Sequence, residues 1–409
     1  MANENAKPQI RFKGFYDDWE GRKLETITDV RDGTHDSPQY VKSGHPFITS
    51  KNVKNGFINC EDIQYISDKD YEEINKRSKV DVNDILMGMI GTIGNIALVR
   101  ETPDFAIKNV ALIKDTGDVF YCYLYHCLQS DFVVRQLGEN LDGGTQKFIA
   151  LNKIRELVIP VPSKFEQHKI GDYMESLNHI IALYQNKYDK LNNIKKSMIE
   201  KMFPKNGSNV PEIRFKGFSG DWEQRKLGEI ADFSKGQGYT KSDLREVGTP
   251  IILYGRLYTK YQSIIREIDT FADIISGAVL SKGGEVILPS SGETAEDIAI
   301  ATSVQKSGVL LGGGLNIVLP HKEIESDFLA IEISFGTPHN ELVKQAQGKS
   351  IVHLYNEDLK KVVVTYPSIE EQQRIGAYFE NFDCLIALHQ RKLEKLKNIK
   401  NSMLKKMFV

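Results

Sequence analysis

The sequence predicts an α+β protein built from two similar mixed α/β domains, which two long antiparallel coiled-coil helices join with pseudo-twofold symmetry. Three observations support this fold class. The sequence repeats itself at a distance of about 204 residues, each repeat ends in a long helical stripe of apolar residues, and each contains short β-rich runs. A chain of 409 residues is long enough for two or three domains.

The composition is that of a folded protein without a strong overall charge. Lysine and arginine total 53 against 55 acidic residues, and 41% of the residues are hydrophobic. A net charge of −2 provides no overall attraction to nucleic acid, so such binding must come from local charges. We expect no membrane association, because the apolar runs are short and the start is polar. The four cysteines form no Cys-x-x-Cys pair, which indicates reduced thiols and a cytoplasmic location.

Two pairs of matching segments define the repeat. The sequence IRFKGF opens both copies, from Ile10 to Phe15 and from Ile213 to Phe218, and an Asp-Trp-Glu segment follows it each time. The second pair begins at Pro162 and at Pro367, carries Glu-Gln and Ile-Gly at the same spacing, and ends in Met-Phe. A period of this length is too long for a solenoid unit, so the chain contains two copies of one domain-plus-helix module.

The end of each copy has the pattern of a long helix with one apolar stripe. Apolar residues recur at steps of three and four, as in the seam of a coiled coil. Ser163 and Ser368 are suited to cap the helix starts, and Pro204 ends the first helix. Because each stripe is a suitable partner for the other, we expect an antiparallel intramolecular pair; two separate helices, each packed on its own domain, are the alternative. The expected packing residues are Leu177, Ile181, Tyr184, Leu191, Met198, Phe382, Ile386, Leu393, Leu396 and Met403.

The repeat also predicts domain boundaries and a closed path. The expected parts are a first domain at 1–162, a helix at 163–203, a second domain at 204–367 and a second helix at 368–409. The first helix leads into the IRFKGF segment of the second copy, whereas the same segment at the start of the chain follows no helix. We therefore expect a cyclic arrangement, in which the N-terminal segment packs near the end of the second helix.

Between the matched ends, the copies share a skeleton but differ in the side chains of equivalent loops. Residues 46–48 align with residues 250–252, for example, yet different polar residues follow them. Such residues contact phosphates and base edges, so one scaffold with two loop chemistries fits a protein that reads two targets. Drifted surface loops are the alternative for any single loop. The candidate contact residues are Arg31, Thr34, His35, Ser50, Lys51, Asn52, Thr145, Gln146 and Lys147 in the first copy, and Lys235, Gln237, Tyr239, Tyr254, Arg256, Tyr258, Lys349 and Ser350 in the second.

Catalytic and metal-binding motifs are missing from the sequence. There is no Pro-Pro dipeptide, and hence no Asp/Asn-Pro-Pro-aromatic loop of an amino-methyltransferase. Gly348 to Ser350 resembles the end of a phosphate-binding loop, but Val343 stands where such a loop needs its first glycine. Histidines and cysteines show no metal-ligand spacing. These absences predict a binding protein rather than an enzyme, with no metal and no cofactor of its own.

The motifs together resemble those of a known family. They are the Arg-Phe-x-Gly-Phe and Asp-Trp-Glu segments before each variable domain, and the Pro-x-x-x-Glu-Gln-x-x-Ile-Gly helix openings at Glu166 and Glu371. This plan, over essentially the whole chain, is similar to the specificity subunit of type I restriction–modification systems. Residues 144–146 match the polar loop before the last strand of a target-recognition domain in that family, whereas residues 348–350 of the second copy depart from it.

The resemblance implies a non-catalytic subunit that gives such a complex its DNA sequence specificity. Each variable domain would bind half of an interrupted double-stranded DNA sequence, and the helices would set the spacer and dock two methyltransferase subunits. Two restriction/translocase subunits would complete the complex. S-adenosylmethionine, ATP and Mg2+ would be used by these partners, and the complex would lie in the bacterial cytoplasm, on the nucleoid when bound to DNA. A two-headed coiled-coil adaptor for proteins is the alternative, and a solitary DNA-modifying enzyme is disfavoured by the missing motifs.

Overall fold

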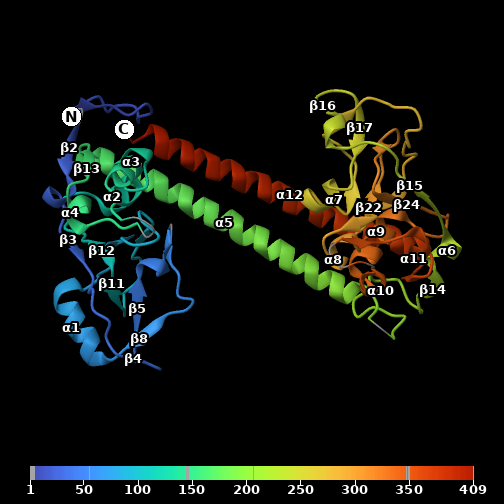
Figure 1. The fold of residues 1–409 in the computed structure, drawn as a ribbon, viewed down its shortest axis with the longest axis horizontal. Helices are drawn as coiled ribbons and strands as arrows, with labels where there is room; N and C mark the ends of the chain where they lie inside the picture. Colours follow the sequence, from blue (N-terminus) through green and yellow to red (C-terminus); the bar gives the residue numbers. More distant parts are fainter. Residues whose placement is uncertain are drawn as a thin grey trace. The chain divides into compact units, whose positions relative to one another are not determined.

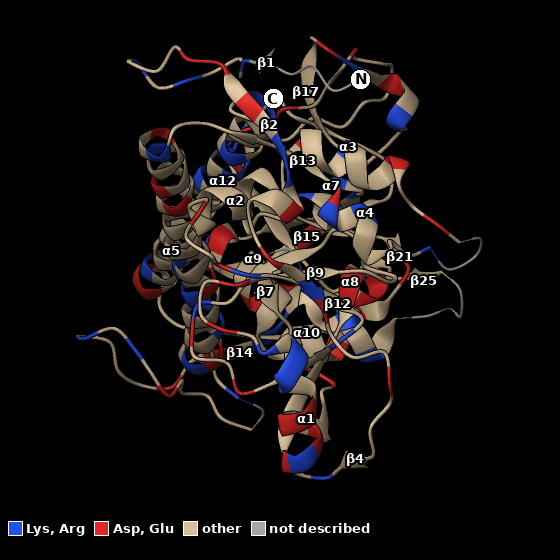
Figure 2. Cartoon of the chain, turned by 90° about the vertical axis from the view of Figure 1, so that its left-hand side faces the viewer, with Lys and Arg blue, Asp and Glu red and all other residues tan. Residues whose placement is uncertain are grey.

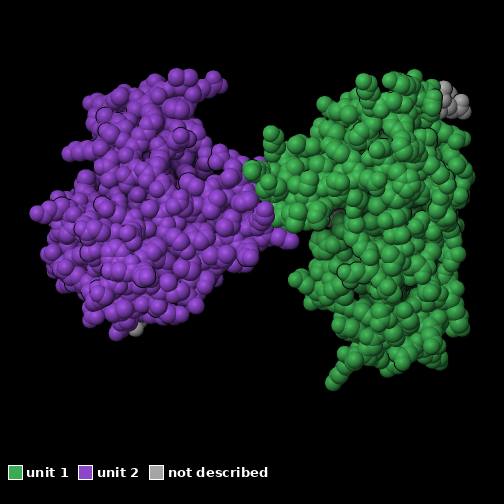
Figure 3. Space-filling model, turned by 180° about the vertical axis from the view of Figure 1, so that it is seen from behind, with its two compact units in different colours: residues 1–184, 392–409 green, residues 185–391 purple. Residues whose placement is uncertain are grey.

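The computed structural model of the chain describes residues 5–54, 56–143, 147–205, 207–346, 348 and 351–408 (Figure 1). The chain divides into two compact units (Figure 3): unit 1 comprises Met1–Tyr184 and Lys392–Val409, and unit 2 comprises Gln185–Arg391. The helices α5 (Lys164–Met202) and α12 (Ile369–Lys406) each contribute to both units. The domain boundaries drawn from the sequence stay a prediction.

Unit 1 holds two four-stranded sheets within the described residues, with the orders β10-β9-β12-β3 and β11-β5-β8-β4. A three-stranded sheet, β1-β2-β13, and the pair β6-β7 accompany them. The strands are β1 (Asn5–Ala6), β2 (Trp19–Lys23), β3 (Val30–Asp32), β4 (Tyr40–Val41), β5 (His45–Thr49), β6 (Val53–Lys54), β7 (Phe57–Ile58), β8 (Gln64–Ile66), β9 (Ile85–Gly88), β10 (Ile96–Leu98), β11 (Ala106–Lys108), β12 (Val110–Ile113) and β13 (Val158–Val161). The helices are α1 (Asp68–Ser78), α2 (Tyr121–Cys127), α3 (Asp131–Glu139) and α4 (Leu151–Arg155), with short 3-10 turns at Leu24–Thr26 and Ser50–Asn52.

Unit 2 has a five-stranded sheet, β15-β24-β20-β22-β18, and a four-stranded sheet, β16-β19-β17-β23. The pairs β14-β26 and β21-β25 accompany them among the described residues. The strands are β14 (Glu223–Lys226), β15 (Ala231–Lys235), β16 (Leu244–Arg245), β17 (Thr249–Ile252), β18 (Ile264–Ile265), β19 (Phe271–Ala272), β20 (Glu285–Pro289), β21 (Ser291–Gly292), β22 (Thr302–Val304), β23 (Leu310–Leu311), β24 (Leu315–Pro320), β25 (Val352–His353) and β26 (Val363–Tyr366). The helices are α6 (Leu227–Ile230), α7 (Arg256–Thr259), α8 (Ala295–Ile298), α9 (Ser326–Phe335), α10 (Thr337–Gln345) and α11 (Asn356–Leu359), with a 3-10 turn at Lys241–Asp243.

The two units share one topology. Strands β3-β12-β9-β10 of unit 1 correspond in order to β15-β24-β20-β22 of unit 2, to which β18 is added at the edge. The second sheets also match strand for strand, and each contains one parallel pair, β11 with β5 and β23 with β17. The prediction of two similar mixed α/β domains is therefore confirmed, although little sequence is shared between them here.

The central sheets are buried on both faces, which explains why their strands are almost continuously apolar. In β9, Ile85 and Met87 pack in one hydrophobic cluster, while Leu86 between them packs in another on the opposite face. In β20 of unit 2, Val286 and Ile287 divide in the same way between two clusters. Successive side chains of a strand point to opposite faces, so each strand supplies both clusters.

The predicted helix pair is confirmed within each unit. In unit 1, Leu177 from the first half of α5 shares a core with Leu404, Met407 and Phe408 from the end of α12 and beyond. In unit 2, Met202 from the end of α5 shares a core with residues near the start of α12, including Ile375 and Phe379. Each helix thus begins in one unit and ends in the core of the other, antiparallel to its partner (Figure 1). The alternative, in which each helix packs only on its own domain, is wrong.

The expected seam residues are all at least partly buried. Leu177 and Leu393 are buried, and the other eight are partly buried. Partial exposure is reasonable for a two-stranded pair, because each seam side chain has protein on one side only. The packing role of each of these residues stays a prediction.

The cyclic arrangement is also confirmed. The backbone N–H of Ile10 donates a hydrogen bond to the carbonyl oxygen of Lys406, and Ile213 makes the equivalent bond to Lys201, both at 2.9 Å. The junction between helix and following segment, which is covalently continuous in the second copy, is thus rebuilt without covalent linkage in the first.

Candidate nucleic-acid interface

The repeated motifs anchor each variable domain to the start of its long helix. Glu166 is 1% exposed and accepts hydrogen bonds from Arg11 Nε and Nη2 at 2.6 and 2.8 Å, and from Trp19 Nε1 at 3.2 Å. In unit 2, Arg214 makes the same two-pronged contact with Glu371, with both bonds at 2.7 Å. A buried carboxylate needs such a partner, because leaving it unpaired would be costly.

The glutamine beside each of these glutamates holds a second loop. Gln167 Oε1 accepts from the backbone N–H of Phe120 at 2.9 Å, and its Nε2 donates to Pro162 O at 2.8 Å. Gln372 bonds Glu325 N at 2.8 Å and Pro367 O at 2.9 Å in the same manner. The Glu-Gln motif therefore acts as a scaffold that positions the domain, and the surfaces that differ between copies lie elsewhere.

In unit 1, the loop after β3 is held against the turn between β11 and β12. The N–H of Thr34 donates to Ile107 O at 3.0 Å, and the N–H of Asn109 donates to Thr34 O at 3.2 Å. Gly33 is required here, because a Cβ at this position would stand 2.2 Å from Ile107 O. Asn109 has a φ of 53°, which favours asparagine over most residues.

His35 extends from this loop and is bonded through both of its ring nitrogens. Its Nδ1 lies 2.7 Å from Asn109 Oδ1, and its Nε2 lies 2.9 Å from Asp32 Oδ2. The two hydrogen bonds, from Asn109 first and Asp32 second, raise the pKa of the imidazole. The two contacts therefore hold the exposed ring in one orientation at the edge of the loop.

The predicted contact residues after β5 have two different roles. Ser50 is buried, donates from its hydroxyl to Asn109 O and accepts from Met89 N at 3.0 Å. Asn52 is buried as well; its Oδ1 accepts from Thr49 N at 3.0 Å and its Nδ2 donates to Asn59 O at 3.1 Å. These two side chains shape the loop from within, whereas Lys51 between them is exposed.

The first copy also has candidates that sequence reasoning missed. Arg77, at the end of α1, pairs with Asp32, and its carbonyl oxygen accepts from Arg31 Nη1 at 3.1 Å. Arg31 also pairs with Asp29. Lys108 donates to Ser37 beside the same turn. No motif marks Arg77 or Lys108, and only the pairing of distant segments brings them to the loop.

In unit 2, the loop after β15 is held in the equivalent way. The N–H of Gln237 donates to Leu311 O at 3.1 Å, and Gly313 N donates to Gly238 O at 2.7 Å. Gln237 and Lys235 are exposed. Tyr239 is largely buried instead; its hydroxyl donates to Asp273 O and accepts from Ile275 N, both at 3.1 Å. The two units thus place different side chains at the end of the same strand.

Residues after β17 again divide between exposed and internal roles. Tyr254 is 44% exposed and meets the ring of Tyr258 edge to face at 6.2 Å. Tyr258 is half-buried and donates to Ser291 O at 2.6 Å; burial raises the pKa of its hydroxyl. The Arg256 side chain is only 8% exposed and is paired with Asp269. Lys260 first, and Arg256 second, hold the pKa of Asp269 far below its usual range.

An aromatic pair that the sequence analysis missed lies beside Lys235. The Lys235 ammonium stands 5.7 Å from the ring centre of Tyr355, and His353 stacks on Tyr355 with centroids 6.1 Å apart. Tyr355 is 45% exposed, and Asn356 next to it donates to Ser234 O at 3.0 Å. Exposed aromatic faces beside cations are suited to contact bases and sugars. In the sequence, Tyr355 is marked as a contact residue by no more than its place after an apolar run, a pattern too common to identify it.

Five expected residues concern the loop before the last strand of each domain. Lys147 is exposed. The other four, Thr145, Gln146, Lys349 and Ser350, lie outside the described residues, so their contact roles stay predictions. Across both copies, most of the described candidates follow equivalent strands, and the exposed ones are Arg31, His35, Lys51, Lys147, Lys235, Gln237 and Tyr254.

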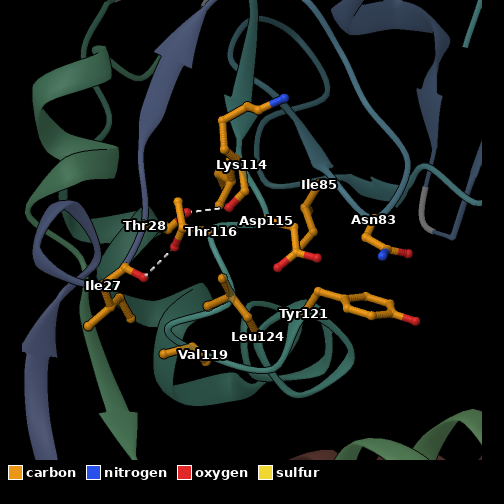
Figure 4. Close-up of a pocket in the computed structure, with 11 residues that line it drawn as sticks. Ile27, Thr28, Asn83, Ile85, Lys114, Asp115, Thr116, Val119, Tyr121 and Leu124 are labelled. Carbon is orange, nitrogen blue, oxygen red and sulfur yellow. Dashed lines mark hydrogen bonds between the residues drawn. The ribbon is translucent and has the colours of Figure 1, made fainter.

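A small cavity lies in unit 1, near the ends of β9 and β12 and helix α2. Thr28, Asn83 and Tyr121 are among the residues that line it (Figure 4). It has room for about one water molecule, and the Thr28 hydroxyl is already bonded to Lys114 O. Among the described residues, no group of His, Cys, Asp and Glu is arranged to bind a metal ion. In the same residues, no helix combines the length and apolarity needed to cross a bilayer.

Charge along α5 is mixed. Lysines are interspersed with aspartates and glutamates along this helix (Figure 2). Some lysines of the two long helices are engaged internally: Lys195 pairs with Asp383 in unit 2, and Lys392 lies over the ring of Tyr184 in unit 1.

Comparison with known proteins agrees with this architecture. The model for the type I restriction modification DNA specificity domain matches twice, over residues 16–193 and 219–398. A protein provisionally named the type I restriction enzyme MjaX specificity subunit, from Methanocaldococcus jannaschii, is 23% identical over 417 residues, covering 95% of this chain and 92% of that one. The MjaVIII specificity subunit of the same organism is 21% identical over 392 residues, covering 90% and 88%.

A solved structure shows the same fold. The type I restriction–modification system S subunit from M. genitalium matches with a TM-score of 0.68 at 15% identity, over 99% of each chain. Two matches of one family model, which together span most of the sequence, coincide with two copies of one domain topology and two paired helices. The chain therefore belongs to the family of type I restriction–modification specificity subunits.

Proposed function

We propose that each variable domain binds one half of a bipartite double-stranded DNA target. One observation carries this proposal: the two variable domains have the same topology but expose different side chains at equivalent positions. His35 and Lys51 stand at strand ends in unit 1, where Gln237 and Tyr254 stand in unit 2. A scaffold that keeps its backbone but changes its reading side chains is suited to recognise two unlike half-sites.

The subunit itself is proposed to be non-catalytic. Methylation and cleavage are assigned to partner methyltransferase and restriction/translocase subunits, which use S-adenosylmethionine, ATP and Mg2+. This division fits a chain whose sequence lacks the catalytic motifs of those activities. Its net charge of −2 fits a complex in which the partners supply much of the contact to DNA phosphates.

The helix pair is proposed to set the spacer between half-sites and to dock the methyltransferase subunits. Support for docking comes from apolar side chains on the outer face of each helix. Ile180 and Leu183 of α5 are exposed, and so are Leu385 and Leu388 at the equivalent positions of α12. Paired exposed leucines and isoleucines on an otherwise polar helix are typical of a protein interface.

The proposal is tested with single substitutions in the complete complex. Lys51→Ala should relax the sequence requirement of one half-site only, and Tyr254→Ala that of the other, each by about 10-fold or more per contacted base pair. The readout is methylation of a DNA library in which one half-site at a time is randomised. Lys23→Ala and Lys226→Ala, at equivalent exposed positions of β2 and β14, are the controls.

Equal losses at both half-sites would remove Lys51 and Tyr254 from sequence reading. Methylation that requires no two-part sequence in the wild type would overturn the bipartite proposal itself. Strongly salt-dependent DNA binding by the isolated chain would contradict the assignment of phosphate contacts to partners, because each phosphate contact steepens the salt dependence.

A further inference from the structure

In each unit a second arginine, in addition to Arg11 or Arg214, fastens the variable domain to the long helix. In unit 1, Arg100 Nη1 lies 2.8 Å from Glu175 Oε2, and Nη2 donates to Oε1 at 3.1 Å. In unit 2, Arg266 Nη2 donates to Glu380 Oε2 at 2.9 Å, and its Nε bonds the other oxygen. Both contacts are forked, with two nitrogens of one guanidinium on two oxygens of one carboxylate.

The two glutamates are equivalent, but the two arginines are not. Glu175 and Glu380 stand at the same distance along their helices from the anchoring glutamates Glu166 and Glu371. Arg100 follows β10, whereas Arg266 follows β18, a strand that unit 1 lacks in its matching sheet. Each of these strands is at the edge of its sheet, in the orders β10-β9-β12-β3 and β15-β24-β20-β22-β18. Two unrelated segments therefore deliver the same group to the same helix position.

A lysine from the second helix lies near each contact. In unit 1, Lys400 of α12 is partly buried within the electrostatic influence of Glu175, which also accepts from His126 Nε2 at 2.9 Å. In unit 2, Lys195 of α5, at the position equivalent to Lys400, pairs with Asp383, one turn along α12 from Glu380. The variable domain, its own helix and the end of the opposite helix thus meet at one point in each unit.

Stability alone gives a weak reason for this recurrence. Arg100 and Arg266 are about half exposed, and ion pairs of that kind contribute little to the free energy of unfolding. A fork-to-fork contact does restrict orientation, because the guanidinium and carboxylate planes must align. The contact is therefore better suited to fixing the angle of the sheet on the helix than to holding the fold together.

That angle matters if the protein reads two half-sites. Adding one base pair to the spacer moves a half-site by about 3.4 Å along the DNA and about 35° around it. A domain that could rock on its helix by such an angle would accept more than one spacer.

We propose that Arg100 and Arg266 are positioning residues that lock each variable domain on its helix and thereby restrict the spacer that the protein accepts. This inference rests on the proposed bipartite reading. It concerns only the orientation of each domain on its helix. The bases that each domain reads are determined by the exposed loops.

The test uses unit 2, where the contact has fewer partners, in the complex with its methyltransferase subunits. The variants are Arg266→Gln, Arg266→Lys and Glu380→Gln, with the exchanged pair R266E/E380R as the rescue. Arg225→Gln is the matched control, because Arg225 pairs with Glu229 and Glu323, and neither of these glutamates belongs to a long helix. Methylation rates are measured on targets with the natural spacer and with one base pair more or less, and thermal unfolding is measured in parallel.

The variants should methylate the natural target at close to the wild-type rate with unchanged base preferences. Their preference for the natural spacer should fall by about 10-fold, equivalent to about 1.4 kcal/mol. Arg266→Lys should behave like Arg266→Gln, because it keeps the charge but loses the fork, and the exchanged pair should restore the preference. Glu380→Gln gives an independent answer if Arg266 variants unfold.

An unchanged spacer profile in Arg266→Gln and Glu380→Gln would overturn the inference while the bipartite proposal stands. A wild-type complex that shows no spacer requirement would overturn both. A broadened profile in Arg225→Gln as well would also overturn it, since general loosening of the domain would then explain the effect.

Discussion

The backbone N–H of Ile10 lies 2.9 Å from the carbonyl oxygen of Lys406, although the two residues are separated by nearly the whole sequence. The same bond joins Ile213 to Lys201, which are close neighbours along the chain. One junction is held by a peptide connection and the other by packing alone. The noncovalent junction therefore depends on contacts such as the ion pair between Arg11 and Glu166. Substituting these residues tests how much the contact stabilises unit 1.

Replacing Arg11 by Ala should destabilise unit 1 by about 3 kcal/mol, because it leaves the buried Glu166 carboxylate with the Trp19 indole as its remaining side-chain donor. Urea unfolding followed by tryptophan fluorescence measures this. A Trp222→Phe background leaves Trp19 as the reporter of unit 1. Lys23→Ala, on an exposed side chain nearby, should change stability by less than about 0.5 kcal/mol. Equal effects of the two substitutions would contradict a role for the ion pair.

The glycines of the two Ile-Gly motifs should respond differently to alanine. A Cβ at Gly171 would stand 2.7 Å from a ring carbon of Phe120 and 3.0 Å from Tyr123 N, whereas the nearest atom at Gly376 is Asp327 Cβ at 3.2 Å. We expect Gly171→Ala to cost about 1–2 kcal/mol by overpacking. Gly376→Ala should be near neutral, because the gain in helix propensity of about 1 kcal/mol offsets a milder contact. Thermal unfolding of both variants provides the comparison, and a larger loss at Gly376 would refute it.

Unit 2 should lose stability as the pH rises because of Glu332 on α9. This carboxyl is fully buried, and burial raises its pKa to about 8. The folded state keeps its proton while an unfolded glutamate releases it near pH 4.3, so the contribution to stability falls between about pH 4.3 and 8 and is level above that. Glu332→Gln removes this dependence. The stability of the variant relative to wild type should therefore rise by a few kcal/mol across the window, at about 1.4 kcal/mol per pKa unit.

Urea unfolding at pH 5, 7 and 9 measures this difference. Glu341→Gln, on the neighbouring helix α10 and partly exposed, serves as a control that should show no comparable trend. A difference between Glu332→Gln and wild type that stays constant with pH would show that the carboxyl is ionised in the folded protein.

Assembly should depend on the outer apolar residues of the long helices. Replacing Ile180 and Leu183 by serine should weaken binding of one methyltransferase subunit by about 100-fold, since buried apolar anchors dominate such interfaces. L385S/L388S should affect the other subunit. The stoichiometry of the purified complex, measured by native mass spectrometry, should fall from two methyltransferase subunits to one in either variant. Asn193→Ser, also exposed on α5, is the control, and full assembly of both double variants would exclude this docking face.

Much of the fold was predictable because its signals are periodic or repeated. The long helices follow from the stripe that includes Leu177 and Leu396, and the cyclic junction follows from the IRFKGF segment that occurs twice. The order of the strands in each sheet could not be predicted in this way. The two central sheets match in topology while their sequences agree only in outline, since any alternating or continuous apolar run satisfies a strand that is buried on both faces.

The candidate site was predictable by position but not by role. Residue type placed Ser50, Asn52 and Arg256 in the variable loops, yet their partners Asn109, Asn59 and Asp269 lie in other segments. Whether a polar side chain faces outward or is bonded within the loop depends on those tertiary partners. For the same reason Arg77 and Tyr355, which reach the loops from other elements, could not be identified from the sequence.

The division of the chain into units has a consequence for synthesis. Unit 2 is a single stretch, Gln185–Arg391, whereas unit 1 combines the start of the chain with its last segment. A ribosome makes the N-terminal part first, but the core around Tyr123 and Phe408 closes only after residues 392–408 have been made. Unit 1, whose synthesis begins first, should therefore be the last to fold completely. Its apolar surface stays exposed while unit 2 folds.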